Sequence, residues 1–118
     1  MVLRNPSPAE LMLLRFLINE ADLLESFGQL LESLEVADME DGGMGSLRLF
    51  PKRLGALDSR FGKCASACQF TDEDGVDVIA SLNLDQLGNL YELDIWKTDF
   101  GKLIRIPENQ RELRREGL

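Results

Sequence analysis

Hydrophobic positions in the first third of the chain recur with the spacing of a helix. The sequence Ser7-Pro8-Ala9-Glu10 has the form of a capping box, in which Ser7 is the N-cap and Pro8 takes the first helical position. A helix is therefore predicted from this point to about Glu20, and its apolar positions are Leu11, Leu13, Leu14, Leu17 and Ile18. A second, less regular helical segment is predicted over residues 22–31, with Gly28 interrupting it.

From Leu34 onward, hydrophobic side chains alternate with polar ones, which is the period of a β-strand. Glycine, asparagine and aspartate, which favour turns, separate the alternating segments. The pattern predicts strands over residues 34–41, 46–50, 61–71, 76–84 and 90–97, and a last extended segment over residues 103–106. For residues 52–59, a simple connection and a short helix are both consistent with the sequence.

Consecutive strands joined by short turns imply antiparallel pairing, and helices that precede such a sheet must bury their apolar positions on one of its faces. The sequence therefore predicts an α+β fold, with two N-terminal helices packed on an antiparallel β-meander of about five strands. A single domain is predicted over residues 1–107. Residues 108–118 are rich in charge and poor in apolar side chains, and they are expected to form a frayed helix or a disordered tail.

The segment 90–97, Leu-Tyr-Glu-Leu-Asp-Ile-Trp-Lys, carries the most information about function. Strict alternation divides it into two faces: Tyr91, Leu93 and Ile95 on one, and Glu92, Asp94 and the only tryptophan, Trp96, on the other. Two interpretations of Trp96 are open. If the strand is inverted or bulged, Trp96 is a core residue under the helices. If Trp96 faces outward, beside two carboxylates, it resembles an interface hot spot.

Composition limits the classes of partner. The chain has 118 residues and a net charge of −8, which repels nucleic acid phosphates and anionic lipid headgroups, so neither nucleic acid nor membrane is predicted as a partner. No apolar run approaches the roughly 20 residues of a membrane-spanning helix, and the first residues do not resemble a secretory signal. The predicted location is the cytoplasm.

Charge is also unevenly distributed along the chain. Residues 32–41 contain five carboxylates and no base, whereas residues 48–63 contain five bases and one acid. Two interpretations are consistent with this pattern. The acidic residues can form a solvated surface that keeps the protein soluble, or they can form a face that attracts a basic protein partner.

Few residues offer chemistry. The chain has no histidine, so a zinc site and nucleophilic catalysis of the usual kind are not predicted, and Cys64 and Cys68 are interpreted as two buried, reduced thiols on one strand face. The glycine-rich residues 42–45 lack the lysine of a phosphate-binding loop and are interpreted as a hairpin turn with positive φ angles. The carboxylate pairs Glu92/Asp94 and Asp38/Glu40 could share a cation only if their strands were neighbours. No metal or cofactor is therefore predicted.

Two stretches, Met39-Glu-Asp-Gly-Gly-Met-Gly-Ser-Leu47 and Tyr91-Glu-Leu-Asp-Ile-Trp-Lys-Thr-Asp-Phe100, together with the opening Arg4-Asn-Pro-Ser-Pro-Ala-Glu10, resemble a family of uncharacterised small bacterial proteins classed as a domain of unknown function. The resemblance supplies no activity and no catalytic residues. It implies that the chain is a bacterial protein of a type often found among immunity or accessory proteins, which bind a toxin or another protein.

The leading functional prediction is a non-enzymatic domain, with an immunity-type role as one form, that binds a basic protein partner through Asp38, Glu40, Asp41, Glu92, Asp94 and Trp96. The alternative from another class is a small enzyme or metal-dependent site built from Glu92, Asp94 and the loop of residues 42–45. A homodimer joined through an uncovered sheet face, with Trp96 at the two-fold axis, is also consistent with the sequence.

Overall fold

The computed structural model describes residues 1–51 and 59–115; the predictions for residues 52–58 and 116–118 lie outside the described residues. The predicted capping box is confirmed, because the Ser7 hydroxyl accepts from the N–H of Glu10 and the Glu10 carboxylate accepts from the N–H of Ser7. The helical elements near the N-terminus are α1 (Pro8–Glu20), α2 (Leu24–Phe27) and the 3-10 helix η1 (Gly28–Glu32). Gly28 was predicted to interrupt the second helical segment, and the structure confirms this, because α2 ends at Phe27 and η1 begins at Gly28.

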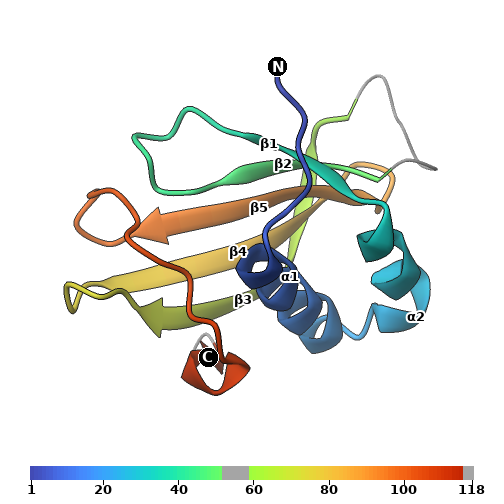
Figure 1. Cartoon of the computed structure of the whole chain (residues 1–118). Helices are drawn as coiled ribbons and strands as arrows, with labels where there is room; N and C mark the ends of the chain where they lie inside the picture. Colours follow the sequence, from blue (N-terminus) through green and yellow to red (C-terminus); the bar gives the residue numbers. More distant parts are fainter. Residues whose placement is uncertain (52–58, 116–118) are drawn as a thin grey trace.

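One antiparallel sheet forms the second layer (Figure 1). Its strands are β1 (Glu35–Asp38), β2 (Leu47–Phe50), β3 (Phe61–Thr71), β4 (Asp77–Asp85), β5 (Leu90–Lys97) and β6 (Arg114–Arg115). The α+β class is thus confirmed, and the described sheet has six strands where about five were predicted, in the order β1-β2-β5-β4-β3-β6. Strands β3, β4 and β5 form a meander, and β2 pairs with the free edge of β5.

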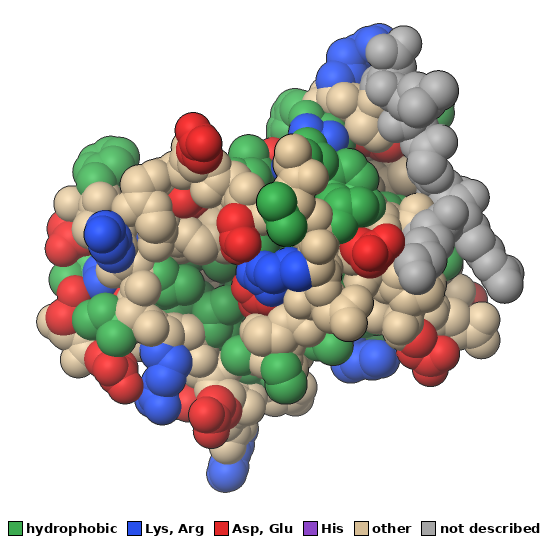
Figure 2. Space-filling view, turned by 45° about the horizontal axis from the view of Figure 1, so that its top comes forward, with side chains coloured by type: hydrophobic (Ala, Val, Ile, Leu, Met, Phe, Trp, Pro, Cys, Tyr) green, Lys and Arg blue, Asp and Glu red, His purple; other side chains and the backbone are tan. Residues whose placement is uncertain are grey.

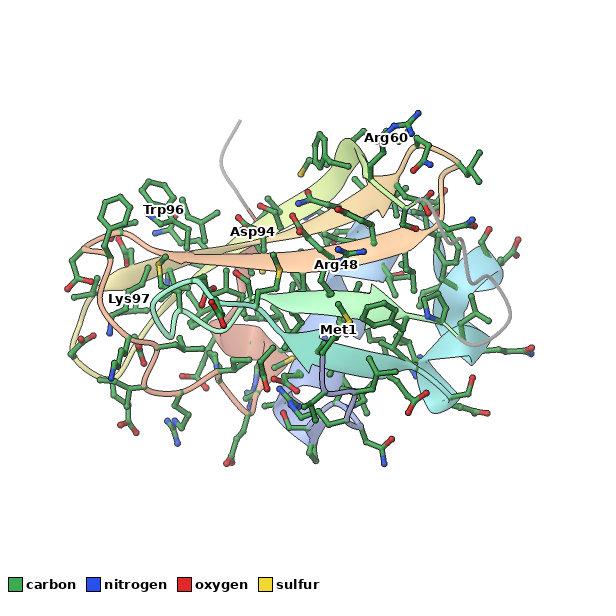
Figure 3. All side chains as sticks on the ribbon, turned by 90° about the horizontal axis from the view of Figure 1, so that it is seen from above. Met1, Arg48, Arg60, Asp94, Trp96 and Lys97 are labelled. Carbon is green, nitrogen blue, oxygen red and sulfur yellow. The ribbon has the colours of Figure 1, made fainter. Side chains whose placement is uncertain are left out.

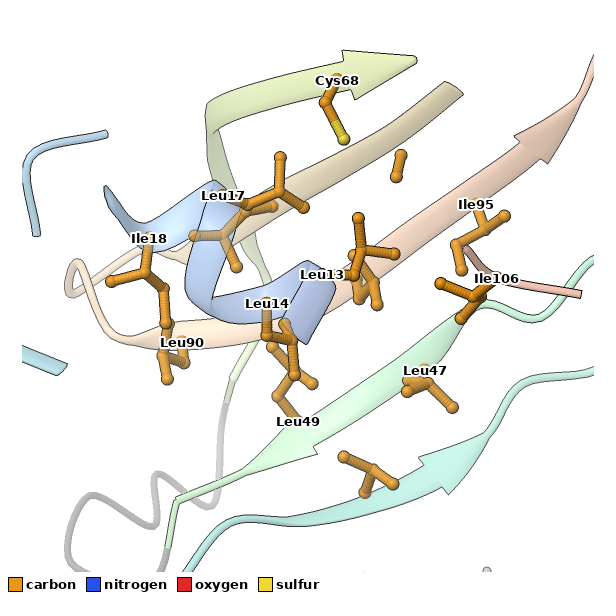
Figure 4. Close-up of a cluster of buried hydrophobic side chains, with 14 of the residues drawn as sticks. Leu13, Leu14, Leu17, Ile18, Leu47, Leu49, Cys68, Leu90, Ile95 and Ile106 are labelled. Atoms are coloured by element: carbon orange, nitrogen blue, oxygen red, sulfur yellow. The ribbon is translucent and has the colours of Figure 1, made fainter. Parts of the chain in front are cut away.

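The core lies between α1 and the sheet (Figure 4). Helix α1 contributes its predicted apolar face, and the inward positions of the central strands supply the other side. Fully buried members of this cluster include Leu13, Leu14, Leu17, Ile18, Leu47, Leu82, Leu93 and Ile95. Burial of each such side chain contributes about 1.5–3 kcal/mol relative to exposure. Alternation in the strands then directs the intervening side chains to the opposite side of the sheet, which no described helix covers (Figure 1); we call this side the open face.

The loop between β1 and β2 explains why the first strand is shorter than predicted. Strand β1 ends at Asp38, and residues 39–46 form an irregular connection that contains three glycines with positive φ, at Gly42 (76°), Gly43 (83°) and Gly45 (98°). This confirms the prediction of a hairpin connection that needs the conformational freedom of glycine.

Irregular pairing in β3 changes the position of one cysteine. The register against β4 shifts between Cys64 and Ser66, so these two residues do not follow simple alternation. Cys68 is buried in the core as predicted, but Cys64 is exposed, which corrects the prediction of two buried thiols. The error arose because strict alternation assigns residues four apart to the same face, and a bulge between them breaks that rule.

A buried ammonium group anchors the end of β5. Lys97 is 1% exposed, and its Nζ donates to Asp72 Oδ2 (2.9 Å), to Asp74 Oδ2 (2.6 Å) and to the carbonyl of Lys102 (3.0 Å). Burial opposes the charge, yet the hydrogen bonds to the two carboxylates raise the pKa of Lys97 overall. All three N–H groups of the ammonium are therefore satisfied.

The buried carboxylate of Asp72 also holds the segment that follows β5. Asp72 accepts from the N–H groups of Ile104 (2.8 Å) and Arg105 (3.1 Å) in addition to Lys97. Burial alone would raise the pKa of Asp72, but these hydrogen bonds lower it overall. Residues 103–106, predicted to be extended, thus lie against the β3–β4 turn without joining the sheet. Beyond them, the described part of the predicted tail contains the 3-10 helix η2 (Gln110–Glu112) and β6.

Within the described residues, no helix has the length and apolar character that crossing a bilayer requires.

Candidate functional site at the end of strand β5

Trp96 and Asp94 lie on the open face near the end of β5 (Figure 3). Their cross-strand neighbours on β4 are Ile79, opposite Trp96, and Ser81, opposite Asp94. The residue between them, Ile95, is buried on the other side, against the core. Trp96 is 40% exposed, so the structure places it outward, next to the carboxylate of the same strand face.

A second aromatic ring accompanies Trp96. The centroid of Phe100 lies 6.1 Å from that of Trp96, with 56° between the ring planes, a tilted geometry that aromatic pairs favour. Phe100 is 71% exposed, and its φ of 63° is in the left-handed region that bulky side chains rarely adopt. A turn closed by its N–H and the carbonyl of Lys97 (2.8 Å) holds it there. Two rings are thus presented to solvent side by side.

Two further carboxylates, those of Glu92 and Asp41, lie near enough to Asp94 to disfavour its ionised form. Partial burial, followed by the negative charges of Glu92 and Asp41, raises the pKa of Asp94 above the ordinary value for aspartate. The Glu92 carboxylate accepts from the side-chain amide of Asn83 (2.9 Å). None of the salt bridges among the described residues includes Asp41, Glu92 or Asp94. These three carboxylates therefore have no ion-pair partner among the described residues.

The β1–β2 loop is fixed against β5 by Asp41 and Ser46. Asp41 accepts from the N–H groups of Met44 (3.0 Å) and Ser46 (2.9 Å). Burial alone would raise the pKa of Asp41, but the Ser46 side chain and these backbone N–H groups lower it overall. The buried Ser46 hydroxyl accepts from the N–H of Ile95 (2.9 Å) and donates to its carbonyl (3.2 Å). Because Ile95 lies between Asp94 and Trp96, this contact brings Asp41 to the site.

The two remaining predicted site residues, Asp38 and Glu40, make no described contact with Asp94 or Trp96. Asp38, at the end of β1, binds the guanidinium of Arg4 (2.8 and 3.1 Å), which also forms a bidentate pair with Glu10 (2.9 Å for each bond). The Arg4 contact lowers the pKa of Asp38. Glu40 is exposed in the loop. Strand β2 separates β1 from β5, so the condition for a four-carboxylate cation site, neighbouring strands, is not met.

A guanidinium stacked on an aromatic ring occupies the next part of the open face. The Arg48 Cζ lies 4.2 Å from the centroid of Tyr91 and 5.6 Å from that of Phe50. Alternation had assigned Tyr91 to the face of Leu93 and Ile95. A register shift against β4 leaves Tyr91 without a paired residue and brings its ring to Arg48, an outward residue between two buried leucines of β2. No signal in the sequence indicates that shift.

Comparison with known proteins gives one match. The model of a family described as "Domain of unknown function (DUF6984)" matches residues 3–107. The chain belongs to this family. A search of curated proteins and a search of solved structures each found no match to it. The predicted resemblance to a family of unknown function is thereby confirmed, and DUF6984 membership assigns no activity to the residues at the end of β5.

Three cavities lined by described residues of the chain lie away from the end of β5. One of about 390 Å³ is lined by Gln29, Leu30, Glu32 and Ser33, one of about 430 Å³ by Ser7, Pro8, Ala9 and Glu108, and one of about 190 Å³ lies around Asp72 and Arg105. Among residues 1–51 and 59–115, no three histidine, cysteine or acidic side chains are grouped so that they could hold a metal.

Charge on another part of the surface differs from that at the β5 site. Figure 2 shows carboxylate and basic side chains interspersed over the face it presents, rather than separated into regions of one sign. On such a surface, charges mainly support solubility. The combination at the end of β5 of exposed aromatic rings with carboxylates that form no described ion pair is therefore the more specific feature.

Proposed function

We propose that this chain is a non-enzymatic protein-binding domain, that its binding surface is the open face at the end of β5, and that its partner is basic there. The observation that carries the proposal is the exposed Trp96–Phe100 pair on the strand face of Asp94, whose neighbours include the carboxylates of Glu92 and Asp41. None of these three carboxylates takes part in a described salt bridge. Below, the aromatic pair and these three carboxylates are called the β5 patch.

The aromatic half of the patch supports binding through its exposed area. Tryptophan is enriched among residues that dominate interface energies, and a partner that covers both rings removes apolar surface from water at about 25 cal/mol per Å². The backbone of Phe100 supports the same conclusion, because a left-handed conformation of a bulky residue costs on the order of 1 kcal/mol. Sites where a protein retains such strain are often functional.

The acidic half supports a basic partner. Partial burial, and then the negative charges of Glu92 and Asp41, disfavour the ionised form of Asp94. A lysine or arginine from a partner would relieve that repulsion, and the net charge of −8 would accelerate the encounter. Association should therefore slow as salt rises, because exposed charges are screened beyond about 8 Å at physiological ionic strength.

An immunity-type role, in which the β5 patch covers a basic toxin, is the specific form of this proposal that the family resemblance suggests. In that form the domain would abolish the toxin's activity when present at one equivalent. An accessory role would leave the partner's activity intact while still depending on Trp96.

The test is affinity capture with matched variants at low and moderate salt. Trp96→Ala removes the aromatic anchor, and Phe61→Ala removes an exposed aromatic at the start of β3 as its control. Asp94→Asn removes one charge of the patch, and Glu25→Gln removes an exposed charge on α2 as its control. A partner retained by both controls, lost by Trp96→Ala and weakened by Asp94→Asn and by salt is the expected result. Equal capture by wild type and Trp96→Ala would refute the proposal.

The mass of the isolated protein should be measured by light scattering before capture. A homodimer through the open face would cover Trp96 and leave no free patch for another protein. A monomer in solution is therefore expected, and a dimer that Trp96→Ala dissociates would contradict the proposal.

One observation favours the alternative of a small enzyme, the raised pKa of Asp94 beside Glu92, because perturbed carboxylates concentrate at catalytic sites. That function would use Asp94 as an acid or base and the loop of residues 42–45 as part of the site. A thermal-shift screen with divalent cations and metabolites separates the two. Stabilisation that Asp94→Asn abolishes would favour the enzyme.

A further inference from the structure

We propose that the β5 patch receives an arginine side chain of the partner, with the guanidinium lying against the Trp96 indole and its N–H groups directed to Asp94. This inference rests on the proposed function and specifies the chemistry of its partner. It is argued from a guanidinium–ring contact on the open face and from the chemistry of the Trp96 and Asp94 side chains.

The chain itself places one guanidinium on an aromatic ring of the open face. Arg48 lies 4.2 Å above the ring of Tyr91, and its register partner across the β2–β5 pair is Glu92, the residue next to Tyr91. The Arg48 Nε is buried and has no hydrogen-bond partner in the described structure. Contact with the aromatic ring, more than hydrogen bonding through Nε, therefore holds this guanidinium on the sheet.

Further along the same strand, an aromatic side chain again lies on the open face, here with a carboxylate on the same side. Trp96 supplies an aromatic face and Asp94 a carboxylate on the same side of β5, and Asp94 is absent from the described salt bridges. Their α-carbons are about 6.8 Å apart, as for any residues i and i+2 of a strand. A guanidinium within about 6 Å of the ring centroid can thus also reach the carboxylate at about 2.8 Å.

The geometry favours arginine over lysine. A guanidinium is planar and can lie flat on the indole while its edge donates two parallel hydrogen bonds to a carboxylate. An ammonium group is compact and more strongly hydrated, so it loses more water when it contacts the ring. Phe100, whose ring is tilted against that of Trp96, adds a second aromatic surface next to the indole.

The experiment uses N-acetyl-arginine amide as the probe and the Trp96 indole N–H as the reporter. The chain has a single tryptophan, so this group gives one indole signal in a two-dimensional ¹H–¹⁵N NMR spectrum of the labelled protein. The probe should shift the signal along a saturable curve. N-acetyl-lysine amide should bind about two- to five-fold more weakly, and the citrulline analogue, which lacks the charge, should cause no saturable shift.

Variants locate the effect. Asp94→Asn should weaken binding of the arginine probe about two- to five-fold, and Glu25→Gln should leave it unchanged. Equal binding of the arginine and citrulline probes, or equal binding by wild type and Asp94→Asn, would overturn the inference.

Failure of this inference is distinguishable from failure of the proposed function. A protein partner captured through Trp96, with no saturable arginine shift, overturns the arginine site and leaves the binding function standing. A saturable shift that depends on Asp94, with no Trp96-dependent partner, supports the site and counts against the binding function.

Discussion

Ser46→Ala tests whether one hydroxyl holds the β1–β2 loop on the strand that carries the candidate site. Ser46 is 4% exposed, and its oxygen forms two hydrogen bonds with a single residue, accepting from the N–H of Ile95 and donating to its carbonyl. Alanine keeps the backbone and most of the volume but removes both bonds. The N–H and carbonyl of Ile95 then lose their partner on this side of β5 in a buried environment.

The expected loss of stability follows from these two groups. A buried polar group that loses its hydrogen bond costs about 1–3 kcal/mol, and the better burial of a methyl group offsets a small part of this. We therefore expect Ser46→Ala to lower the free energy of unfolding by about 2–3 kcal/mol, equivalent to a fall of roughly 10 °C in Tm for a chain of this length.

Urea unfolding followed by far-ultraviolet circular dichroism measures the change. Ser26→Ala, on the exposed side of α2, is the matched control and should alter stability by less than about 0.5 kcal/mol. Ser46→Thr retains the oxygen and should recover part of the loss. If Ser46→Ala were as stable as Ser26→Ala, the hydroxyl would not hold the loop to β5, and the gathering of Asp41 with Asp94 would need another explanation.

Three further outcomes are expected in the same unfolding assay. Lys97→Met should destabilise the fold strongly, because it leaves the carboxylates around the buried ammonium without their counter-charge, whereas Lys102→Met, on the surface, should have little effect. Gly62→Ala should lower the free energy of unfolding more than Gly88→Ala. A Cβ at Gly62 would lie 2.2 Å from a backbone carbonyl of β4. A Cβ at Gly88 would meet no atom within 4 Å, so that substitution should add only the strain of a φ of 85°, about 1–2 kcal/mol. Asp94→Asn should stabilise the protein at pH 7. Because the folded pKa of Asp94 is raised, its ionisation opposes folding above that pKa, and the difference from wild type should vanish below the unfolded value near 3.8.

Features with a local cause could be predicted from the sequence. The capping box at Ser7 depends on residues within one helical turn, and the start of α1 lies where the pattern placed it. The glycine-rich turn after β1 is likewise decided by the few residues whose φ angles must be positive. Strands β3, β4 and β5 were predicted within one residue at each end, because their alternation is long enough to define a period.

Features that depend on pairing between distant strands could not be predicted. A bulge is a property of two strands together, so alternation along one of them misplaced Cys64 and Tyr91. The local sequence of β2 does not indicate that this strand pairs with β5, although the pairing brings Asp41 near Asp94. Lys97 illustrates the same limit. Its position in the period is inward, but a lysine at a strand end is usually solvated, and the carboxylates that make its burial possible lie more than 20 residues earlier in the chain.

Phe100 connects these considerations of stability with the functional proposal. Glycine or asparagine would form the same left-handed turn after β5 with less strain, and the phenylalanine ring, largely in solvent, contributes little to the core. What the ring does contribute is its contact with Trp96, which widens the exposed aromatic surface next to Asp94. A side chain that strains its backbone, adds little burial and enlarges an exposed patch is difficult to explain by folding alone. Its contribution to free energy would become favourable once a partner covers both rings, which is why the open face, rather than the helical layer, is the surface we propose for binding.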